Sequence, residues 1–417
     1  MSLLTLSVFV LISGLASAGQ RLVYSGDVCS STPLILSDDQ RHGLEVRDSF
    51  TQAPLGPAIA TNSSESPWKP QGECFTTPVD NRTETFCVFS SQAFADGRGI
   101  SILTTPDRAE YIRRLPAFVE PDALSGANSH LSPPYEEREL PGRGRGLIAK
   151  KTLHRGDQIF ADTPILVGDE DALFGLEKND WITLINRAVD ELPPGSKEMF
   201  WNLYARPKSD PASDRFDTNA FAVGVEEHLQ YVVFPEMSLI NHDCRPNAVY
   251  VFDPRTLTQY VHAMTTIPIG TEITITYVNP LMPRQHRLKH LYSSWRFNCS
   301  CSACGLQANI SLASDSRLNQ IIDLRRQIDQ GDGASLQMAE TLISLYEQER
   351  LYASISDVYQ IAALSACSEG QRWSAIKYAR LAVEIGLLND GPDERSLLMK
   401  ALAEEPEKEP CWLKRVI

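Results

Sequence analysis

Residues 299–304 read Cys299-Ser-Cys301-Ser-Ala-Cys304, which is the most specific local pattern in this chain of 417 residues. Three thiols at C-x-C-x-x-C spacing can surround one tetrahedral zinc ion. Disulfides are the alternative, but cysteines this close form strained pairs, and three of them cannot pair evenly among themselves. The pattern therefore favours a zinc site.

A zinc ion of this kind takes a fourth ligand from elsewhere in the chain. The leading candidate is Cys244, which lies in the segment Asn-His-Asp-Cys-Arg-Pro-Asn at 241–247. His286 and His290 are weaker candidates. The segment 241–247 gains weight from its neighbours, because a strand-like run, Glu-Ile-Thr-Ile-Thr-Tyr at 272–277, follows it and the cysteines come next.

A glycine-rich loop lies upstream, where residues 142–149 read Gly-Arg-Gly-Arg-Gly-Leu-Ile-Ala. Glycines allow the backbone to approach a bound cofactor closely. The triplet at 97–99 is also Gly-Arg-Gly, but Pro106 and a charged stretch follow it. We prefer the triplet at 144–146, because a strand, a turn at Gly156 and a second strand follow it. No dinucleotide-binding fold is expected, because no strand and acidic partner frame the loop.

Together these segments resemble a SET domain with a cysteine-rich post-SET tail, over residues 142–304. The resemblance is to the SET-and-MYND group and its fungal relatives. It implies an α+β fold, with a β-rich SET fold, a zinc-bound post-SET tail and a helical C-terminal domain. The insert between Gly168 and Asn219 contains no cysteine, so the MYND zinc finger of that group is missing.

The resemblance implies a protein-lysine N-methyltransferase that transfers a methyl group from S-adenosyl-L-methionine. Tyr277 is similar to the catalytic tyrosine, whose hydroxyl orients the substrate amine. Phe221 and Trp295 resemble walls of the lysine channel. The residues that resemble the cofactor-binding set are Gly144, Arg145, Gly146, Asn241, His242, Tyr277 and Phe297. The zinc ligands are expected to be Cys244, Cys299, Cys301 and Cys304.

Two other functions compete with catalysis. One is a non-catalytic scaffold, in which a zinc-stabilised SET fold serves as a module for protein–protein interaction. The other is a secreted, disulfide-rich protein of unrelated function. The scaffold need not bind S-adenosylmethionine, and disulfides resist alkylation until they are reduced, so both alternatives can be tested.

Composition limits the partners. Hydrophobic residues make up 42% of the chain and charged residues 22%, which is typical of a globular protein. The formal net charge is −14, which disfavours direct binding of nucleic acid and favours a basic peptide. A protein with an accessible lysine is therefore the expected partner, and histone tails are the default substrate of the family.

The N-terminus, residues 1–18, is typical of a secretory signal, because an apolar stretch runs from Leu3 to Leu15 and the small residues Ala-Ser-Ala follow it. A Ser/Thr/Pro-rich region is expected over 19–135, the SET and post-SET domain over 136–305, and a helical, tetratricopeptide-like domain over 306–417. No later segment is long and apolar enough for stable membrane insertion once the signal is removed. The signal suggests the secretory pathway, whereas zinc thiolates and this cofactor suggest cytoplasm or nucleus.

Local patterns predict the elements of these regions. Strand-like runs outside the N-terminal region are expected at 147–149, 158–160, 165–167, 248–252, 260–263 and 272–277. Further strand-like pieces are expected at 86–89 and 100–103, and Cys74 could pair with Cys87 across a hairpin if the chain is secreted. Apolar residues at helical spacing predict helices around 321–328, 342–346 and 373–385. A plain helical bundle is the alternative to a tetratricopeptide-like repeat.

Overall fold

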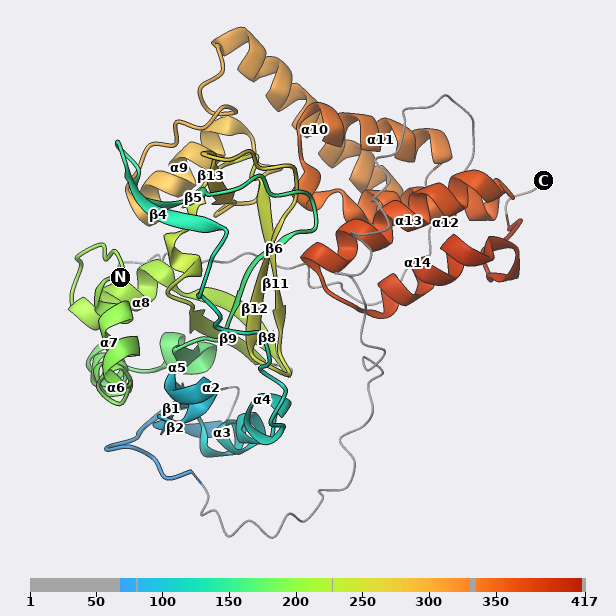
Figure 1. Ribbon diagram of the computed structural model, residues 1–417. Helices are drawn as coiled ribbons and strands as arrows, with labels where there is room; N and C mark the ends of the chain where they lie inside the picture. Colours follow the sequence, from blue (N-terminus) through green and yellow to red (C-terminus); the bar gives the residue numbers. More distant parts are fainter. Residues whose placement is uncertain (1–67, 80–81, 227, 331–334, 415–417) are drawn as a thin grey trace.

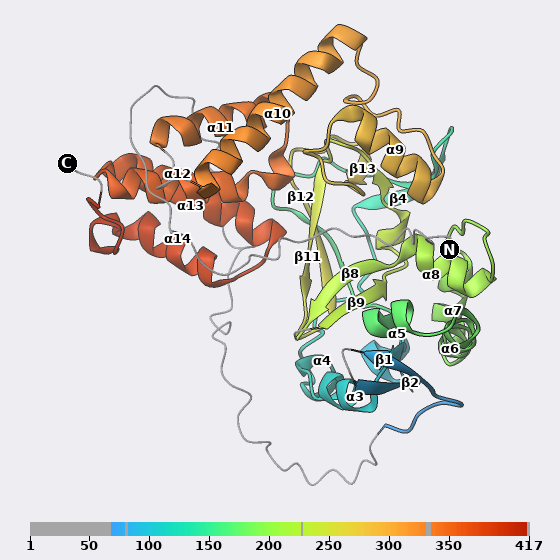
Figure 2. The ribbon, with the colours of Figure 1, turned by 180° about the vertical axis from the view of Figure 1, so that it is seen from behind.

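The computed structural model describes residues 68–79, 82–226, 228–330 and 335–414. Three sheets and their flanking helices give a mixed α+β fold, as expected (Figure 1). Helices α10 to α14 gather on one side of the β-rich part, and helices α5 to α8 lie on the other side (Figures 1 and 2). The expected signal segment, residues 1–18, and Cys29 lie outside the described residues.

The largest sheet has six strands in the order β1-β2-β3-β7-β9-β8. Neighbouring strands are antiparallel except β3 and β7, which run parallel. The strands are β1 (Phe75–Val79), β2 (Arg82–Ser91), β3 (Ile100–Thr104), β7 (Leu166–Asp169), β9 (His228–Val233) and β8 (Phe221–Val225). The sheet therefore joins strands from both sides of residue 135, where the sequence suggests a domain boundary.

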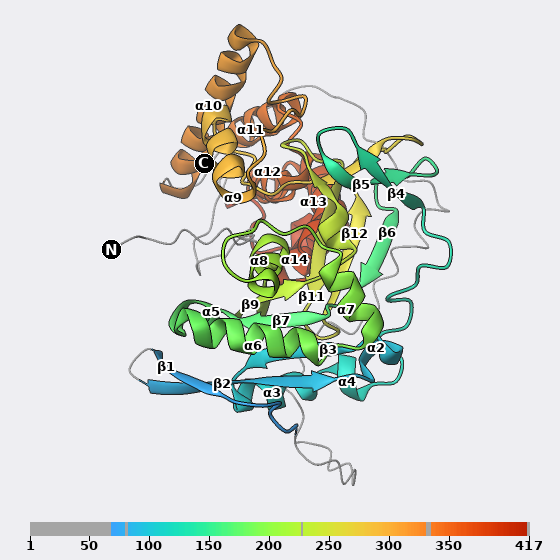
Figure 3. The same cartoon turned by 90° about the vertical axis from the view of Figure 1, so that its left-hand side faces the viewer.

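Both faces of this sheet are buried, because side chains along a strand alternate between the faces. In β2, Phe86 and Val88 pack into a core with α6 (Lys178–Asp190). Cys87 and Phe89 point to the opposite face and contact Ala109 of α3. Figure 3 shows α6 and α3 on the two sides of the strands. The other helices of this part are α2 (Phe94–Gly97), α3 (Pro106–Arg113), α4 (Pro116–Val119), α5 (Glu170–Gly175), α7 (Pro194–Trp201) and α8 (Pro211–Asn219).

Two smaller sheets carry the segments that the motifs identify. One has the order β10-β13-β5-β4 and the other β11-β12-β6. Their strands are β4 (Tyr135–Leu140), β5 (Gly144–Ala149), β6 (Gln158–Asp162), β10 (Asn241–His242), β11 (Ala248–Asp253), β12 (Thr258–Ala263) and β13 (Glu272–Ile275). Buried Leu147, Val261 and Ile273 pack these strands into one core. The parallel pairing of β10 with β13 brings Asn241 opposite Thr274 and His242 opposite Ile275.

The remaining elements of the described chain are helical. They are α9 (Arg284–Trp295), α10 (Ala308–Gln330), α11 (Leu336–Gln348), α12 (Ser356–Ser368), α13 (Arg372–Asn389) and α14 (Glu394–Glu404), with short 3-10 turns η2 (Met237–Leu239), η3 (Tyr352–Ser354) and η4 (Pro406–Lys408). Helices α10 to α14 share a separate apolar core, and Val249 and Met264 of the β-rich part belong to it. The helical C-terminal region is confirmed, while its tetratricopeptide-like character stays a prediction.

Two disulfides are present among the described cysteines. Cys74 pairs with Cys87, as the sequence allowed, and Cys367 pairs with Cys411, which the sequence did not suggest. Within the parts of the chain that the structure describes, none of the helices combines the length and apolarity that crossing a membrane requires.

Candidate active site

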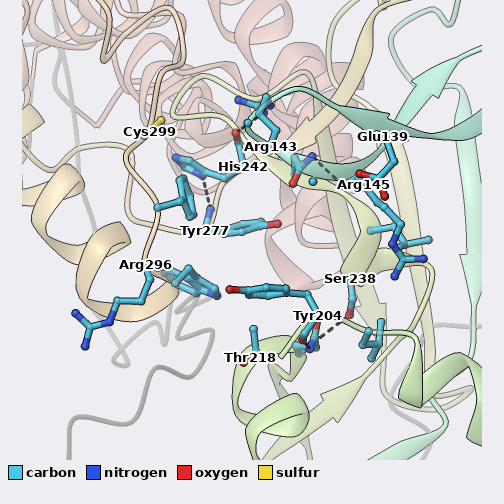
Figure 4. A pocket seen from close by; sticks show the side chains of 18 of the residues that line it. Glu139, Arg143, Arg145, Tyr204, Thr218, Ser238, His242, Tyr277, Arg296 and Cys299 are labelled. Carbon is cyan, nitrogen blue, oxygen red and sulfur yellow. Dashed lines mark hydrogen bonds between the residues drawn. The ribbon is translucent and has the colours of Figure 1, made fainter. Parts of the chain in front are cut away.

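A cavity of about 520 Å³ lies between the β4–β5 turn, the segment before β10, the loop after α7 and the end of α9 (Figure 4). Most of the residues that the resemblance identifies line it. From the expected cofactor and catalytic sets it includes Gly144, Arg145, Asn241, His242, Tyr277 and Phe297. The expected channel residue Trp295 and the expected zinc ligand Cys299 also line it. Segments far apart in the sequence therefore meet at one cavity.

Four cysteines form a buried group beside this cavity, which we call the cysteine cluster: Cys244, Cys299, Cys301 and Cys304. Their sulfur atoms all lie within 4.8 Å of one another, and none is in a disulfide. Zinc–sulfur bonds of about 2.3 Å in a tetrahedron place sulfurs about 3.8 Å apart. The cluster therefore fits a structural zinc ion, with Cys244 as the fourth ligand. His286 and His290 are exposed on α9 instead.

The side chains of His242, which is polar, and Arg287, which is cationic, complement the negative charge that thiolates of the cysteine cluster would carry. The His242 Nδ1 atom accepts a hydrogen bond from the Tyr277 backbone N–H at 3.0 Å, so its Nε2 atom carries the proton, 3.2 Å from the Cys244 sulfur. Burial lowers the pKa of His242 to about 3, which keeps the ring neutral. Arg287 is 1% exposed. Burial lowers its pKa, but the nearby Cys244 and Cys304 sulfurs outweigh this and raise it, so Arg287 stays cationic.

The glycine-rich loop is held against the segment 241–247 by hydrogen bonds. Arg143 donates to the His242 carbonyl at 3.0 Å and pairs with Glu272. Asn241 Nδ2 donates to the Arg145 carbonyl at 3.0 Å and to Glu272 at 2.9 Å. A Cβ atom on Gly146 would lie 2.7 Å from Asn241 Nδ2. Gly146 is not among the cavity-lining residues; it permits the close approach of Asn241 to β5.

Aromatic rings form the other end of the cavity. The Tyr277 hydroxyl donates to the Ile240 carbonyl at 2.6 Å, and the ring centre lies 5.3 Å from those of Trp295 and His242. Burial raises the pKa of Tyr277, so its hydroxyl is neutral at physiological pH. Phe297 lies 6.1 Å from His242, between ring centres. In the view of Figure 4, Tyr204 and Tyr277 lie one above the other in the cavity.

Phe221 is the expected channel residue that the structure does not bring to the cavity. It is 2% exposed, and its ring packs against Tyr250 and Phe234, with ring centres 5.7 Å and 6.3 Å away. The reason is local, because Phe221 begins β8 and its side chain points into the central core. Tyr204, which is 63% exposed, provides an aromatic side chain at the cavity instead.

The segment 241–247 is also tied to the helical C-terminal region. Arg245 donates to the Cys244 carbonyl at 2.8 Å and to Glu349 at 2.8 Å. Glu349 ends up between Arg245, Arg317 and Ser314, with only 5% of its side chain exposed. The buried ion pair between Arg245 and Glu349 therefore holds the segment 241–247, which contains Cys244 of the cysteine cluster, against the helical C-terminal region.

Several lining residues were not identified from the sequence. Arg143 lies inside the quoted glycine loop, but its bond to the His242 carbonyl has no sequence signal. Tyr204 lies in a loop that carries no motif. The further lining residues of this kind are Glu139, Asn202, Leu203, Thr218, Asn219, Ser238, Leu239, Arg296, Asn298 and Ser300.

Comparison with known proteins agrees with this site. Residues 144–278 match the family model of the SET domain, so the chain contains a SET domain. Over 195 residues it is 29% identical to the histone-lysine N-methyltransferase set5 of Schizosaccharomyces pombe, covering 46% of this chain and 55% of that protein. It is 35% identical over 88 residues to the N-lysine methyltransferase SMYD2-B of Danio rerio, covering 21% and 20% of the two chains. It is 27% identical over 153 residues to human SMYD2, covering 35% and 33%. The match thus spans about half of the first relative and a third or less of the others.

Proposed function

We propose that this SET-domain protein is a protein-lysine N-methyltransferase that uses S-adenosyl-L-methionine. The main observation in support of the proposal is that most of the expected cofactor-binding and catalytic residues line one cavity. Its walls include the glycine loop, the Asn241–His242 strand and the aromatic side chains of Phe297, Tyr277 and Trp295. The similarity to histone-lysine and N-lysine methyltransferases supports the same activity.

The residues present fit the cofactor. Gly144 has a φ of +68° and no atom within 4 Å of an added Cβ, so the loop leaves room for a ligand. Phe297 offers an aromatic face for an adenine ring. Arg145 would contact the amino-acid end of the cofactor, and Asn241 would hold methionine and adenine groups. The two ring nitrogens of His242 already have partners in the protein, so this residue would contribute to the site through its backbone. When bound, S-adenosylmethionine supplies the methyl group from a positively charged sulfonium.

The aromatic residues of the cavity act on the methyl acceptor, which is the amine of the substrate lysine. A lysine amine has a pKa of about 10.4 in water and must lose its proton before it can attack. The aromatic side chains of Tyr277 and Trp295 provide an apolar environment that favours the neutral amine. The Tyr277 hydroxyl, held by the Ile240 carbonyl, can accept a hydrogen bond from that amine. Alignment of donor and acceptor at near-attack distance then contributes a large part of the rate enhancement.

The cysteine cluster would hold zinc in a structural role. Four protein sulfurs close the coordination shell, which is typical of structural rather than catalytic zinc. The ion would fix Cys299, and with it the neighbouring Phe297, beside the segment 241–247. As substrate we propose a protein with an accessible lysine in a basic segment, because the chain has a net charge of −14.

Calorimetric binding of S-adenosylmethionine to the zinc-loaded full chain, combined with a methyl-transfer assay on histone substrates, tests the proposal. The wild type should bind the cofactor and transfer methyl groups. Asn241→Ala should lose binding, whereas Tyr277→Phe should keep binding and lose at least about 100-fold in turnover. A folded, zinc-containing wild type that binds no cofactor would support the scaffold function instead. Unchanged turnover in Tyr277→Phe would refute the role of this tyrosine.

A further inference from the structure

A second group of side chains that could hold a metal ion lies outside the cavity lining and the cysteine cluster. It consists of His130, Asp162 and Glu236, which we call the His-Asp-Glu cluster. His130 lies in the loop between α4 and β4, Asp162 ends β6, and Glu236 directly precedes η2. One potential ligand atom from each lies within 4.8 Å of those of the other two. Three separate segments therefore converge on one point.

The distances within this cluster lie on either side of those expected for ligands around an ion. His130 Nε2 lies 2.9 Å from Asp162 Oδ1 and 3.7 Å from Glu236 Oε1. Bonds of about 2.1 Å from a cation to nitrogen and oxygen place neighbouring ligand atoms about 3.0–3.4 Å apart. His130 Nε2 and Asp162 Oδ1 are both buried, yet neither has a partner in hydrogen-bond geometry. The two atoms are thus close without the nitrogen's N–H pointing at the oxygen.

Asp162 provides an independent indication of a ligand. Its side chain is fully buried, with 0% exposure, and neither of its two carboxylate oxygens has a hydrogen-bond partner. A buried carboxylate left without hydrogen bonds is costly unless an ion or a charged group compensates it. Beyond His130, the nearest cation to this group is Arg98, and the Arg98 guanidinium is engaged by both oxygens of Glu236 at 2.9 Å and 2.7 Å.

The surroundings resemble an outer coordination shell. The Tyr135 hydroxyl lies 3.3 Å from His130 Nδ1, the ring nitrogen that faces away from the cluster. Arg98 fixes the Glu236 carboxylate, and Asn128 fixes the loop of His130 because its Oδ1 accepts from the Thr163 backbone N–H at 2.9 Å. Ligating histidines and carboxylates are commonly oriented by such partners.

We propose that His130, Asp162 and Glu236 bind one divalent cation of the Mn²⁺ or Zn²⁺ class, in a structural site separate from the cysteine cluster. One imidazole nitrogen and two carboxylates suit these ions. The ion by itself offsets the two carboxylate charges, and Arg98 adds a further positive charge that holds Glu236. Glu236 lies just before Ser238 and Leu239, which line the cavity. The ion would therefore tie the loop of His130 to the base of the cavity wall.

Metal analysis of the full chain tests this site. The protein is loaded with one equivalent of Zn²⁺, which fills the cysteine cluster, and is then dialysed against Mn²⁺; both metals are measured by mass spectrometry. Because thiolates select zinc over manganese, we expect about one zinc and about one manganese per chain. Asp162→Asn and His130→Gln should each weaken Mn²⁺ binding at least about tenfold. His154→Gln, at an exposed histidine, is the matched control and should bind like the wild type.

Retained zinc and an unchanged circular dichroism spectrum show that a variant has folded. If Asp162→Asn does not fold, His130→Gln decides, because the His130 side chain is 32% exposed and tolerates replacement better. A folded wild type that takes up neither Mn²⁺ nor a second zinc would overturn the proposal and leave a metal-free ionic cluster. Equal Mn²⁺ uptake by the wild type and His130→Gln would overturn it as well.

Discussion

Replacing Glu349 with glutamine is expected to destabilise the full chain by about 3–5 kcal/mol. Glu349 and Arg245 form a pair at 2.8 Å whose side chains are 5% and 3% exposed. Glutamine keeps the size and one acceptor but removes the charge, so the Arg245 guanidinium remains buried without its counter-ion. Arg317, at 28% exposure, can turn to solvent and adds little to this cost.

Chemical denaturation followed by circular dichroism measures the change in the free energy of unfolding. The matched control is Asp323→Asn, which removes an ion pair with Arg326 whose side chains are 59% and 58% exposed. That control should cost less than about 1 kcal/mol. Because Arg245 follows Cys244 directly, Glu349→Gln should also release zinc faster to a chelator. A loss of unfolding free energy no larger than that of Asp323→Asn, with zinc release unchanged, would show that the buried pair does not stabilise the segment 241–247.

Three further outcomes follow from the site and its surroundings. Chelation should make the four thiols of the cysteine cluster reactive to alkylation without a reductant, while the two disulfides resist it; peptide mapping that finds the four thiols unreactive after chelation would contradict a metal site. Gly146→Ala should destabilise the chain by about 1–3 kcal/mol, because the new Cβ would lie 2.7 Å from Asn241 Nδ2. Thermal denaturation measures both effects, with Gly195→Ala as the control: Gly195 lies in a helix with open space around an added Cβ, so this variant should be as stable as the wild type or more stable. Tyr204→Ala should lower methyl-transfer efficiency on the protein substrate about tenfold or more while calorimetric cofactor affinity stays unchanged; equal losses in both would place Tyr204 at the cofactor instead.

The sequence predicted the parts of the site whose chemistry needs particular residues at fixed spacing. The cysteine cluster is the clearest case, because three thiols at C-x-C-x-x-C spacing can surround one tetrahedral zinc ion, and the structure brings Cys244 to them as the fourth member. The strand-like runs coincide with β2, β3, β5, β6, β7, β11, β12 and β13, except that the runs 165–167 and 272–277 extend beyond β7 and β13 by one and two residues. Alternation and turn residues are local properties, so these elements could be identified without knowledge of the fold.

The remaining features depend on contacts between distant segments. A channel wall needs only an aromatic side chain of suitable size, so nothing in the sequence separates Tyr204, which lines the cavity, from Phe221, which packs in the core. The partner of Cys367 is 44 residues away across two helices, and spacing alone does not reveal it. Similarly, the run at 100–103 indicates a strand but not its parallel pairing with β7.

That parallel pair has a consequence for biosynthesis. When the β1–β2 hairpin and β3 leave the ribosome, the strand that completes their open edge has not yet been translated, and β9 and β8 follow later still. The nascent chain therefore exposes an apolar edge during this interval, which is a hazard for association between chains. We expect the protein to need chaperone assistance during synthesis, and fragments that begin at residue 136 to be insoluble, because they leave the same edge of β7 without its neighbour.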